Sequence, residues 1–417
     1  MRVAIVCYYS PPQPAIASHR VLRMSRALLA AGHQVHWVTA DTSRFDPDVL
    51  DSSLGSLVPD EVRVHHLGGR ALITKPVAAN PWEKVLRTLA WHMPRHFAWP
   101  DSFISWARTL RRRLPGLLSR NSIEAVVLCC SPHNQILVLP GLRRALPDLQ
   151  IFVDYRDLLS GNPWNPRSSS KQAARILTLE RRVLASADAL FVNTGAAREK
   201  FVEVVGAVGH LAVEVVRNAA DYDLADQIEA MVEEPDLGPG VHLGFFGTLF
   251  PRRRLRPLLD AMASLPPADR DRVVLHVYCD ALDSAAILEE DLAAVPVVRD
   301  RVERHGYLGY ISALRAMQAM DALVLVNGPE ADDAVFVPGK LYDYLMARRP
   351  VVFVGHPGDA RQVVERTSGA GWCFGPTDIE GLRGCLERIL SEHPARLSKS
   401  LEDGPERSFA PLLNRLA

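Results

Sequence analysis

Short apolar runs, rich in valine and isoleucine, alternate along this chain with longer stretches of helical pattern. Most of the runs are apolar at successive positions, which is typical of strands buried on both faces of a parallel sheet. Strand, helix and strand repeated in this order predict an α/β architecture with doubly wound sheets. The runs are, in chain order, VAIVCYY, VHWVTA, VRVHHL, AVVLCC, IFVDY, ALFVNT, HLGFFG, VVLHVYC, ALVLVN and PVVFVG.

The alternation breaks between Ala220 and Gly240. The segment there, DYDLADQIEAMVEEPDLGPG, carries seven acidic residues and no basic one, and it closes on Gly-Pro-Gly. An exposed acidic helix followed by a turn is typical of a domain junction. The sequence therefore predicts two Rossmann-like domains, 1–220 and 221–395, that face a cleft. Ligands of open α/β sheets bind at the carboxyl ends of the strands, on loops and helix N-termini.

The composition excludes several classes of function. Lys+Arg and Asp+Glu are both 48 among 417 residues, so the net charge predicts no bulk attraction to nucleic acid. The six cysteines show neither metal-ligand nor disulfide-framework spacing, which indicates reduced core residues of a cytosolic protein. The chain starts without the long apolar core of a signal peptide, and no run is long enough to span a membrane. We therefore expect a cytoplasmic protein.

The segment VFVPGKLYDYLMARRPVVFVG, residues 335–355, joins a helical stretch to an apolar strand. Pro338 suits the first helical position, and Gly339 allows close approach of the backbone. The free N–H groups of this first turn form an anion site, to which Lys340 adds charge. Asp343, one turn further on, can accept hydrogen bonds from vicinal hydroxyls. Phosphate beside ribose hydroxyls indicates a nucleotide. The alternative is an ordinary surface helix with an aspartate near its N-terminus.

A second segment, GFFGTLFPRRRLRPLLDAM, indicates the same chemistry. A strand ends in the turn Gly247–Thr248, and arginines precede the next helix. A glycine turn followed by arginines can hold a diphosphate leaving group. The near-complete lack of acids in this segment favours an anion site over a solvated basic turn. The arginines are Arg252, Arg253, Arg254 and Arg256.

Together these stretches resemble the retaining nucleotide-sugar glycosyltransferases of the glycosyltransferase-B fold, and among them the large family-four class. The resemblance extends over nearly the whole chain. MRVAIVCYYSPPQPAIASHRVLRMSRALLAAGHQVHWVT is similar to the opening strand, loop, helix and second strand of that family. LERRVLASADALFVNT with VVRNAAD resembles the end of its first domain. GFFGTL, HGYLGYISALRAMQAMDALVLV and PGKLYDYLMARRPVVFVG resemble its nucleotide-binding half.

The resemblance implies a nucleoside diphosphate sugar as donor, held mainly by the C-terminal domain, with no further cofactor. Backbone around His305, Gly306 and Tyr307 would meet the base, and Asp343 would meet the ribose. Metal would be unnecessary, because basic side chains and a helix terminus stabilise the leaving diphosphate. The N-terminal domain would bind the acceptor, and the last helix, 396–417, would cross back to it. Thr248, the arginine cluster and the turn at Gly339–Lys340 would meet the diphosphate. The residues predicted to bind the donor nucleotide also include Gly247, Arg253, Arg254 and Leu341.

Two departures from the family pattern bear on this site. The family commonly has glutamate where this chain has Asp343, which keeps the charge but shortens the reach by one methylene. It also commonly has a glutamate eight residues earlier, in contact with the transferred sugar, where this chain has Val335. The sugar contacts and the identity of the donor sugar are therefore left open.

Transfer from a nucleotide sugar passes through an oxocarbenium-like state, which demands stabilisation of the leaving group and alignment of the acceptor hydroxyl. The chain shows no obvious pair of catalytic carboxylates, as in a family that manages without a clear enzyme nucleophile. His133, in CSPHN after a strand, is the candidate for a polar group near the sugar. Its alternative is a loop histidine that caps the next helix. Asp157, in DYRD, is the candidate for orienting a hydroxyl, with Arg156 as a structural salt-bridge partner.

Residues 81–120 combine aromatic and basic side chains. They hold eight Lys or Arg residues against two acids. One interpretation is an acceptor wall or peripheral membrane contact, with aromatics at the interface and arginines on anionic headgroups. The other is a pair of helices that pack tryptophan into the core and expose a basic face. The tryptophans are Trp82, Trp91, Trp99 and Trp106.

The predicted activity is transfer of a sugar, with retention of configuration, to a hydroxyl acceptor that is a polysaccharide, a glycolipid or a natural product. Two alternatives stay open. A sugar-nucleotide epimerase of the same fold would need a histidine and several acids converging in the cleft, a set that the sequence does not show. A non-catalytic nucleotide-binding homologue is favoured by one feature, Val335.

Overall fold

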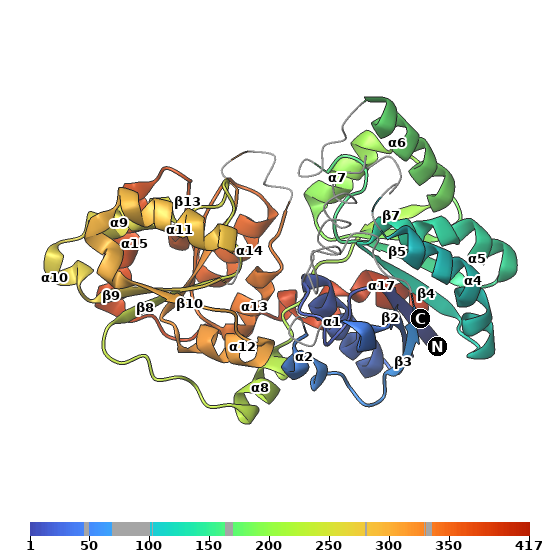
Figure 1. Ribbon diagram of the computed structural model, residues 1–417, viewed down its shortest axis with the longest axis horizontal. Coiled ribbons are helices and arrows are strands. Elements are labelled where there is room, and N and C mark those ends of the chain that lie inside the picture. The colour runs from blue at the N-terminus through green and yellow to red at the C-terminus, as the bar shows by residue number, and fades with distance from the viewer. Residues whose placement is uncertain are drawn as a thin grey trace, which may run out of the picture. The chain divides into compact units, whose positions relative to one another are not determined.

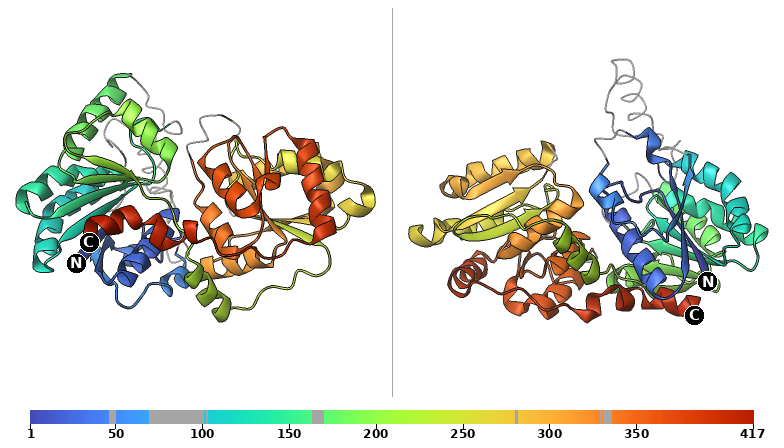
Figure 2. Two further views of the ribbon diagram at one scale, coloured as in Figure 1. Left: turned by 180° about the vertical axis from the view of Figure 1, so that it is seen from behind. Right: turned by 90° about the horizontal axis from the view of Figure 1, so that it is seen from below.

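The computed structural model describes residues 1–45, 50–68, 101, 103–162, 170–279, 282–328, 330 and 336–417. The chain divides into two compact units (Figure 1), of which unit 1 is Met1–Arg217 with Phe409–Ala417 and unit 2 is Asn218–Ser408. Of the predicted terminal segment 396–417, only the part from Phe409 onward belongs to unit 1. The two chain ends lie side by side on unit 1 in every view (Figures 1 and 2).

Unit 1 is built on a parallel sheet of seven strands in the order β3-β2-β1-β4-β5-β6-β7. The order reverses between β1 and β4, the point at which open sheets of this type bind ligands. Its elements are β1 (Arg2–Cys7), α1 (Ile16–Ala30), β2 (Gln34–Ala40), η1 (Thr42–Arg44), α2 (Ser52–Gly55), β3 (Arg63–Leu67), α4 (Ile104–Arg120), β4 (Ala125–Cys130), η4 (His133–Val138), α5 (Leu139–Ala145), β5 (Gln150–Tyr155), α6 (Ser170–Leu184), β6 (Ala189–Val192), α7 (Gly195–Val204), β7 (Ala212–Val215) and α17 (Ala410–Leu416).

Helices cover both faces of this sheet (Figure 2). Strand β4 is buried at every position, as expected of a strand with helices on either side. Helices α4 to α7 contribute side chains to one core cluster, among them Leu110, Leu142, Ile176 and Phe201. Helix α1 packs against β1 and β2 outside this cluster. The continuous apolarity of the runs therefore reflects burial from two sides.

Unit 2 repeats the plan with six parallel strands in the order β10-β9-β8-β11-β12-β13, and the order reverses between β8 and β11. The predicted α/β fold with two Rossmann-like, doubly wound domains is therefore confirmed. The elements are α8 (Tyr222–Met231), β8 (Val241–Phe246), α9 (Arg256–Ala263), α10 (Pro267–Arg270), β9 (Val273–Tyr278), α11 (Leu282–Ala294), η5 (Pro296–Arg301), β10 (Val302–His305), α12 (Tyr310–Ala319), β11 (Ala322–Val326), α13 (Lys340–Ala347), β12 (Val351–Val354), α14 (Asp359–Ser368), η7 (Ala370–Trp372), β13 (Cys373–Phe374), α15 (Ile379–Glu392), η8 (Leu401–Asp403) and α16 (Pro405–Ser408).

The aromatic and basic block at 81–120 is described only in part, because Trp82, Trp91 and Trp99 lie outside the described residues. Trp106 is fully buried in α4, and its indole N–H donates to the Gln135 side-chain oxygen at 3.3 Å. Trp106 is therefore a core residue, and the interfacial interpretation is wrong for it. No helix in the described part of the chain is long and apolar enough to cross a bilayer.

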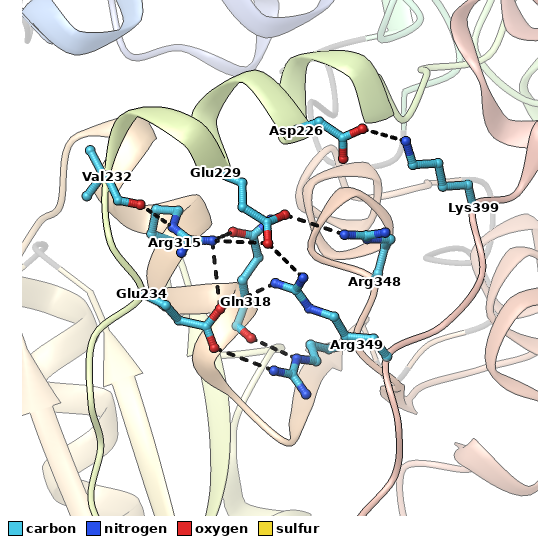
Figure 3. Close-up of polar contacts among 10 residues, drawn as sticks. Asp226, Glu229, Val232, Glu234, Arg315, Gln318, Arg348, Arg349 and Lys399 are labelled. Carbon is cyan, nitrogen blue, oxygen red and sulfur yellow. Dashed lines mark hydrogen bonds and ion pairs between the residues drawn. The ribbon is translucent and has the colours of Figure 1, made fainter.

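Glu229 of helix α8 and Glu234 just after it are paired with arginines, although the sequence predicted an exposed acidic helix (Figure 3). Glu229 and Glu234 share arginines that come from α12, from the residues just after α13 and from the segment after α15. The shortest of these contacts joins Glu229 to Arg396 at 2.9 Å. The network therefore fastens the start of unit 2 to segments that follow it by 81 residues (Glu234 to Arg315) to 167 residues (Glu229 to Arg396). The arginines are Arg315, Arg348, Arg349 and Arg396.

Replacing Glu229 with glutamine should destabilise unit 2 above about pH 5 and change little near pH 3. The hydrogen bond from Arg396, helped by the charges of Arg315 and Arg348, lowers the pKa of Glu229. A lowered carboxyl pKa contributes stability that is present above the unfolded-state pKa and is lost as the pH falls. We expect the free energy of unfolding to fall by about 1 kcal/mol at neutral pH, since solvent screens this partly exposed group. Urea denaturation of wild type and variant across this pH range measures the difference.

Glu203→Gln is the matched control, because the exposed Glu203 carboxylate forms one ion pair with Lys200 at 3.0 Å. Removing this charge should change the stability by only a few tenths of a kcal/mol. An equal loss of unfolding free energy in Glu229→Gln and Glu203→Gln at neutral pH would contradict the role given to Glu229. So would a Glu229→Gln difference that stays the same near pH 3.

Candidate functional site

The turn after β8 and the first residue of α13 meet where the strand order of unit 2 reverses. Gly247 has a φ of +113°, which favours glycine, and exposed Thr248 follows it. A β-carbon built on Gly247 would lie 3.8 Å from Lys340 Cδ and 3.9 Å from Lys340 Nζ. The Lys340 amino group also lies 3.9 Å from the centroid of the Phe245 ring, a cation–π contact. Two residues predicted from separate segments, Gly247 and Lys340, are therefore neighbours.

Lys340 is half-buried beside a second cation. Burial, together with the nearby charge of Arg253, lowers the pKa of Lys340 to about 7. No ion pair to a carboxylate is formed by Lys340 within the residues that the structure describes. A bound anion would favour the protonated amine and offset the repulsion between the two cations. This corner of unit 2 is therefore suited to a phosphate or diphosphate group.

The arginines after Gly247 differ in their surroundings. Arg254 donates hydrogen bonds to the carboxylates of Asp291 and Glu290, each at 2.9 Å. Its guanidinium is therefore committed to helix α11, and this geometry favours a structural role for Arg254 over the predicted diphosphate role. Arg253, which lies near enough to Lys340 to lower its pKa, is the better placed guanidinium. The other two arginines also form ion pairs, Arg252 with Glu330 and Arg256 with Asp260.

The first turn of α13 offers fewer N–H groups than the sequence suggested. The N–H of Leu341 donates to the Pro338 carbonyl at 3.0 Å, and the Leu341 side chain is fully buried. Leu341 is therefore a core residue whose N–H is already engaged, and its predicted contact with the donor nucleotide is not favoured. The N–H groups of Gly339 and Lys340 come before this bond, so they are the donors at the helix start.

Asp343 lies one turn into α13 and accepts a hydrogen bond from the hydroxyl of Tyr310 at 3.0 Å. Tyr310 is the first residue of α12, and the loop from Gly306 to Gly309 directly precedes it. The bond therefore connects the predicted ribose ligand to the segment predicted to meet the base. Tyr344, on the same helix, accepts a hydrogen bond from the Phe246 N–H at 3.0 Å and so holds α13 against the end of β8.

A row of stacked rings lies at the carboxyl ends of β8, β9 and β10. The rings of Phe246 and Tyr278 are 4.4 Å apart and 3° from parallel. Those of Tyr278 and His305 are 4.3 Å apart and 13° from parallel. Gly306 and Tyr307 follow this row, and the Tyr307 side chain is 54% exposed. Sequence reasoning missed Phe246 and Tyr278, although each ends an apolar run with an aromatic residue.

In unit 1, His133 and Asp157 occupy the loops after the neighbouring strands β4 and β5. The Nε2–H of His133 donates to the Asp157 carbonyl at 2.8 Å, and the His133 ring packs edge-on against Tyr155 at 5.3 Å. His133 is the first residue of the 3₁₀ helix, and the Asn134 N–H in its first turn donates to the Asp101 carboxylate at 2.9 Å. These contacts do not favour the helix-capping alternative for His133. The Asp157 carboxylate lies 3.5 Å from the Arg156 guanidinium. The two predicted residues are therefore brought together at the ends of β4 and β5, next to the reversal between β1 and β4.

Sequence reasoning missed the ion pair between Arg20 and Asp154. Arg20 Nε and Nη2 donate to the two Asp154 oxygens at 2.8 and 2.6 Å, and both side chains are almost fully buried. The same guanidinium donates to the carbonyls of Val216 and Arg217 at 2.8 and 2.9 Å. Its position near the start of α1 and its complete set of partners indicate a structural role. The only available signal was the arginine in the opening helix.

The two parallel, doubly wound sheets match the architecture of solved structures with the glycosyltransferase-B fold. Sucrose-phosphate synthase from Thermosynechococcus elongatus is 17% identical with a TM-score of 0.61, covering 100% of this chain and 97% of that one. HepE from Anabaena, in complex with UDP and glucose, is 15% identical with a TM-score of 0.57, covering 100% and 95%. A trehalose-phosphate synthase (UDP-forming) from Burkholderia xenovorans is 13% identical with a TM-score of 0.58, covering 100% and 96%. At these identities the likeness establishes the fold.

Residues 17–219 match the family model described as "Glycosyl transferase 4-like domain". This segment makes up most of unit 1, so the predicted resemblance to the family-four class is confirmed. The chain therefore contains a glycosyl transferase 4-like domain. No curated protein matches it at a significant level.

Proposed function

We propose that this chain transfers glucose or a related hexose from a uridine diphosphate sugar to a hydroxyl acceptor, with retention of configuration. The observation that carries the proposal is Lys340, half-buried against Gly247 and Phe245 beside Arg253, a cationic corner suited to diphosphate. Two of the similar structures support the choice of nucleotide, since HepE is in complex with UDP and the trehalose-phosphate synthase is described as UDP-forming.

In this proposal unit 2 stabilises the leaving group. Lys340 and Arg253 bind the diphosphate through charge, and the N–H groups of Gly339 and Lys340 add hydrogen bonds at the positive end of the α13 dipole. The turn at Gly247 and Thr248 lets the backbone approach the phosphates. As the glycosidic bond to the diphosphate breaks, negative charge grows on its oxygens, and these fixed donors stabilise it. The chemical step therefore needs no metal ion.

The remaining contacts orient the donor and the acceptor. Asp343 accepts hydrogen bonds from the ribose hydroxyls, and the backbone of Gly306 and Tyr307 meets the base. His133 and Asp157, on unit 1, contact the sugar or the acceptor hydroxyl. In a retaining transfer without an enzyme nucleophile, the leaving phosphate oxygen takes the proton of the acceptor hydroxyl. The acceptor is a polysaccharide, a glycolipid or a natural product, and the site of action is the cytoplasm.

UDP should raise the melting temperature of the protein more than GDP or TDP does. A ligand that binds the folded state adds about 2.7 kcal/mol of stability at one hundred times its Kd. The measurement is a thermal-shift series with the three diphosphates at equal concentration, with and without a chelator. A shift that needs added metal would contradict the metal-independent mode of binding. If none of the three nucleotides raises the melting temperature, the proposed donor class is contradicted.

Turnover of UDP-glucose without acceptor separates the transferase from its alternatives. Slow release of UDP with free glucose is the expected result, because water replaces the acceptor. An epimerised sugar would instead identify an epimerase, and unchanged UDP-glucose despite binding would identify a non-catalytic homologue. Val335, the feature that favours this last alternative, lies outside the described residues.

A further inference from the structure

Three imidazoles form a row across strands β8, β9 and β10 of unit 2. His242 Nδ1 lies 2.9 Å from His276 Nε2, and His276 Nδ1 lies 3.0 Å from His305 Nε2. The strand register pairs His276 with Glu303, and residues 303 and 305 share one face of β10 because side chains alternate along a strand. Glu303 therefore joins the row at its outer end.

The outer three side chains form a compact triangle of potential metal ligands. Glu303 Oε2 lies 3.3 Å from His276 Nδ1 and 3.7 Å from His305 Nε2. With the 3.0 Å between the two nitrogens, the edges of the triangle run from 3.0 to 3.7 Å. Tetrahedral zinc with bonds of about 2.0–2.2 Å separates its ligand atoms by about 3.3–3.6 Å. One ion could therefore contact all three atoms with little movement of the side chains.

The inner end of the row fixes the tautomers. His242 Nε2 lies 3.2 Å from the Gly238 carbonyl, which can only accept, so this nitrogen carries a proton. His242 Nδ1 then accepts from the protonated Nε2 of His276. The lone pair of His276 Nδ1 is thereby left on the side of Glu303 and His305. A ligating histidine whose other N–H is held by a hydrogen bond is the usual outer arrangement of metal sites in proteins.

We propose that His276, His305 and Glu303 bind a divalent transition-metal ion, with Zn²⁺ as the ion to test. Two imidazoles and one carboxylate suit zinc and leave a fourth position for water or another ligand. The His276 side chain is 3% exposed, whereas those of His305 and Glu303 are 32% and 57% exposed, so solvent reaches the site from one side. The ion would link the edge strand β10 to β9. This proposal does not depend on the proposed sugar transfer.

A second histidine pair in the chain provides a contrast. In unit 1, His36 Nδ1 and His65 Nε2 also lie 3.0 Å apart, but the charges beside His36 are those of Arg63 and Arg2. Positive neighbours repel a cation, and a carboxylate is the missing third ligand. Within the described residues, His276, Glu303 and His305 are the group that brings three ligand atoms of this kind together.

The test is a Zn²⁺ titration of chelator-stripped protein against a competing chromophoric chelator, with Glu303→Gln and His65→Gln alongside. Wild type and His65→Gln should bind one Zn²⁺ per chain with equal affinity. Glu303→Gln should bind at least ten times more weakly, since one of three ligands is lost. Added Zn²⁺ should raise the melting temperature of wild type and His65→Gln but not of Glu303→Gln.

Exposed Glu303 is a site where substitution leaves folding intact, and equal melting of the zinc-free proteins checks this. His305→Gln is the second variant, and it should lose Zn²⁺ to a similar degree. The proposal is overturned if wild type shows no saturable binding of Zn²⁺. It is equally overturned if Glu303→Gln and His305→Gln bind the ion as tightly as wild type does.

Discussion

Arg20→Ala should lower the free energy of unfolding of unit 1 by about 3–5 kcal/mol. The change leaves the Asp154 carboxylate buried without its guanidinium, at 1% exposure of its side chain. It also removes two hydrogen bonds to the carbonyls of Val216 and Arg217, which lie at the end of unit 1. Breaking a buried pair from one side costs far more than the pair itself contributes, because an uncompensated charge remains in a medium of low polarity.

Tryptophan fluorescence during denaturation is a suitable probe, because six of the seven tryptophans fall within residues 1–217 of the sequence. Arg143→Ala is the control. Arg143 also forms a two-pronged pair, with both Asp188 oxygens at 2.7 Å, but those side chains are about one-third exposed. We expect Arg143→Ala to lower the free energy of unfolding by only about 1 kcal/mol. If Arg20→Ala costs no more than Arg143→Ala, the structural role assigned to Arg20 is wrong.

Lys340→Ala should weaken UDP binding by about 1.5–3 kcal/mol, or roughly 10- to 150-fold. The pKa of Lys340 is about 7 in the free protein, and a bound diphosphate should raise it. Above about pH 7 the amine must take up a proton when UDP binds, so the affinity of wild type should fall as the pH rises. The variant should lack this part of the pH dependence. Calorimetric titration at several pH values measures both effects.

The same substitution should leave the ligand-free protein as stable as wild type or more stable. A lysine whose pKa is lowered on folding destabilises the folded protein at every pH below the ordinary lysine pKa of 10.5, because the unfolded chain then binds the proton more tightly. Arg256→Ala is the control, because Arg256 pairs with Asp260 on its own helix and should not alter UDP affinity by more than about twofold. Unchanged affinity in Lys340→Ala would remove the diphosphate site from this corner of unit 2.

Much of the fold was predictable because burial on both sides of a parallel sheet leaves a local signature. The runs AVVLCC and HLGFFG needed no knowledge of their partners to be identified as strands. In the sheet of unit 2, β8 and β11 are neighbours, so the segments that follow them lie at the same edge. Gly247 follows β8 and Lys340 follows β11, which explains why two separate segments of sequence predicted one site. Both inferences rest on patterns within short stretches of sequence.

The partners of charged side chains were not predictable, because they depend on residues that are distant in sequence. Arg254 is satisfied by Asp291 on α11, so an arginine that looked like a phosphate ligand has a structural partner. Glu229 is neutralised by Arg396, which no local pattern connects to an acidic helix. Trp106 was ambiguous for a related reason, since an amphipathic basic helix presents the same sequence whether its apolar face meets lipid or a protein core.

The return of the chain at Phe409 makes unit 2 an insertion into the fold of unit 1. Phe409, Leu412 and Leu416 are buried, and the Arg20 guanidinium lies 5.6 Å from the Phe409 ring centroid. A fragment that stops at Arg217 would thus lack a piece of its own interior. Residues 218–408, by contrast, form one uninterrupted stretch, which makes them the portable module. If unit 2 binds the donor as proposed, swapping residues 218–408 between related proteins should exchange the donor preference while both splice points stay in place.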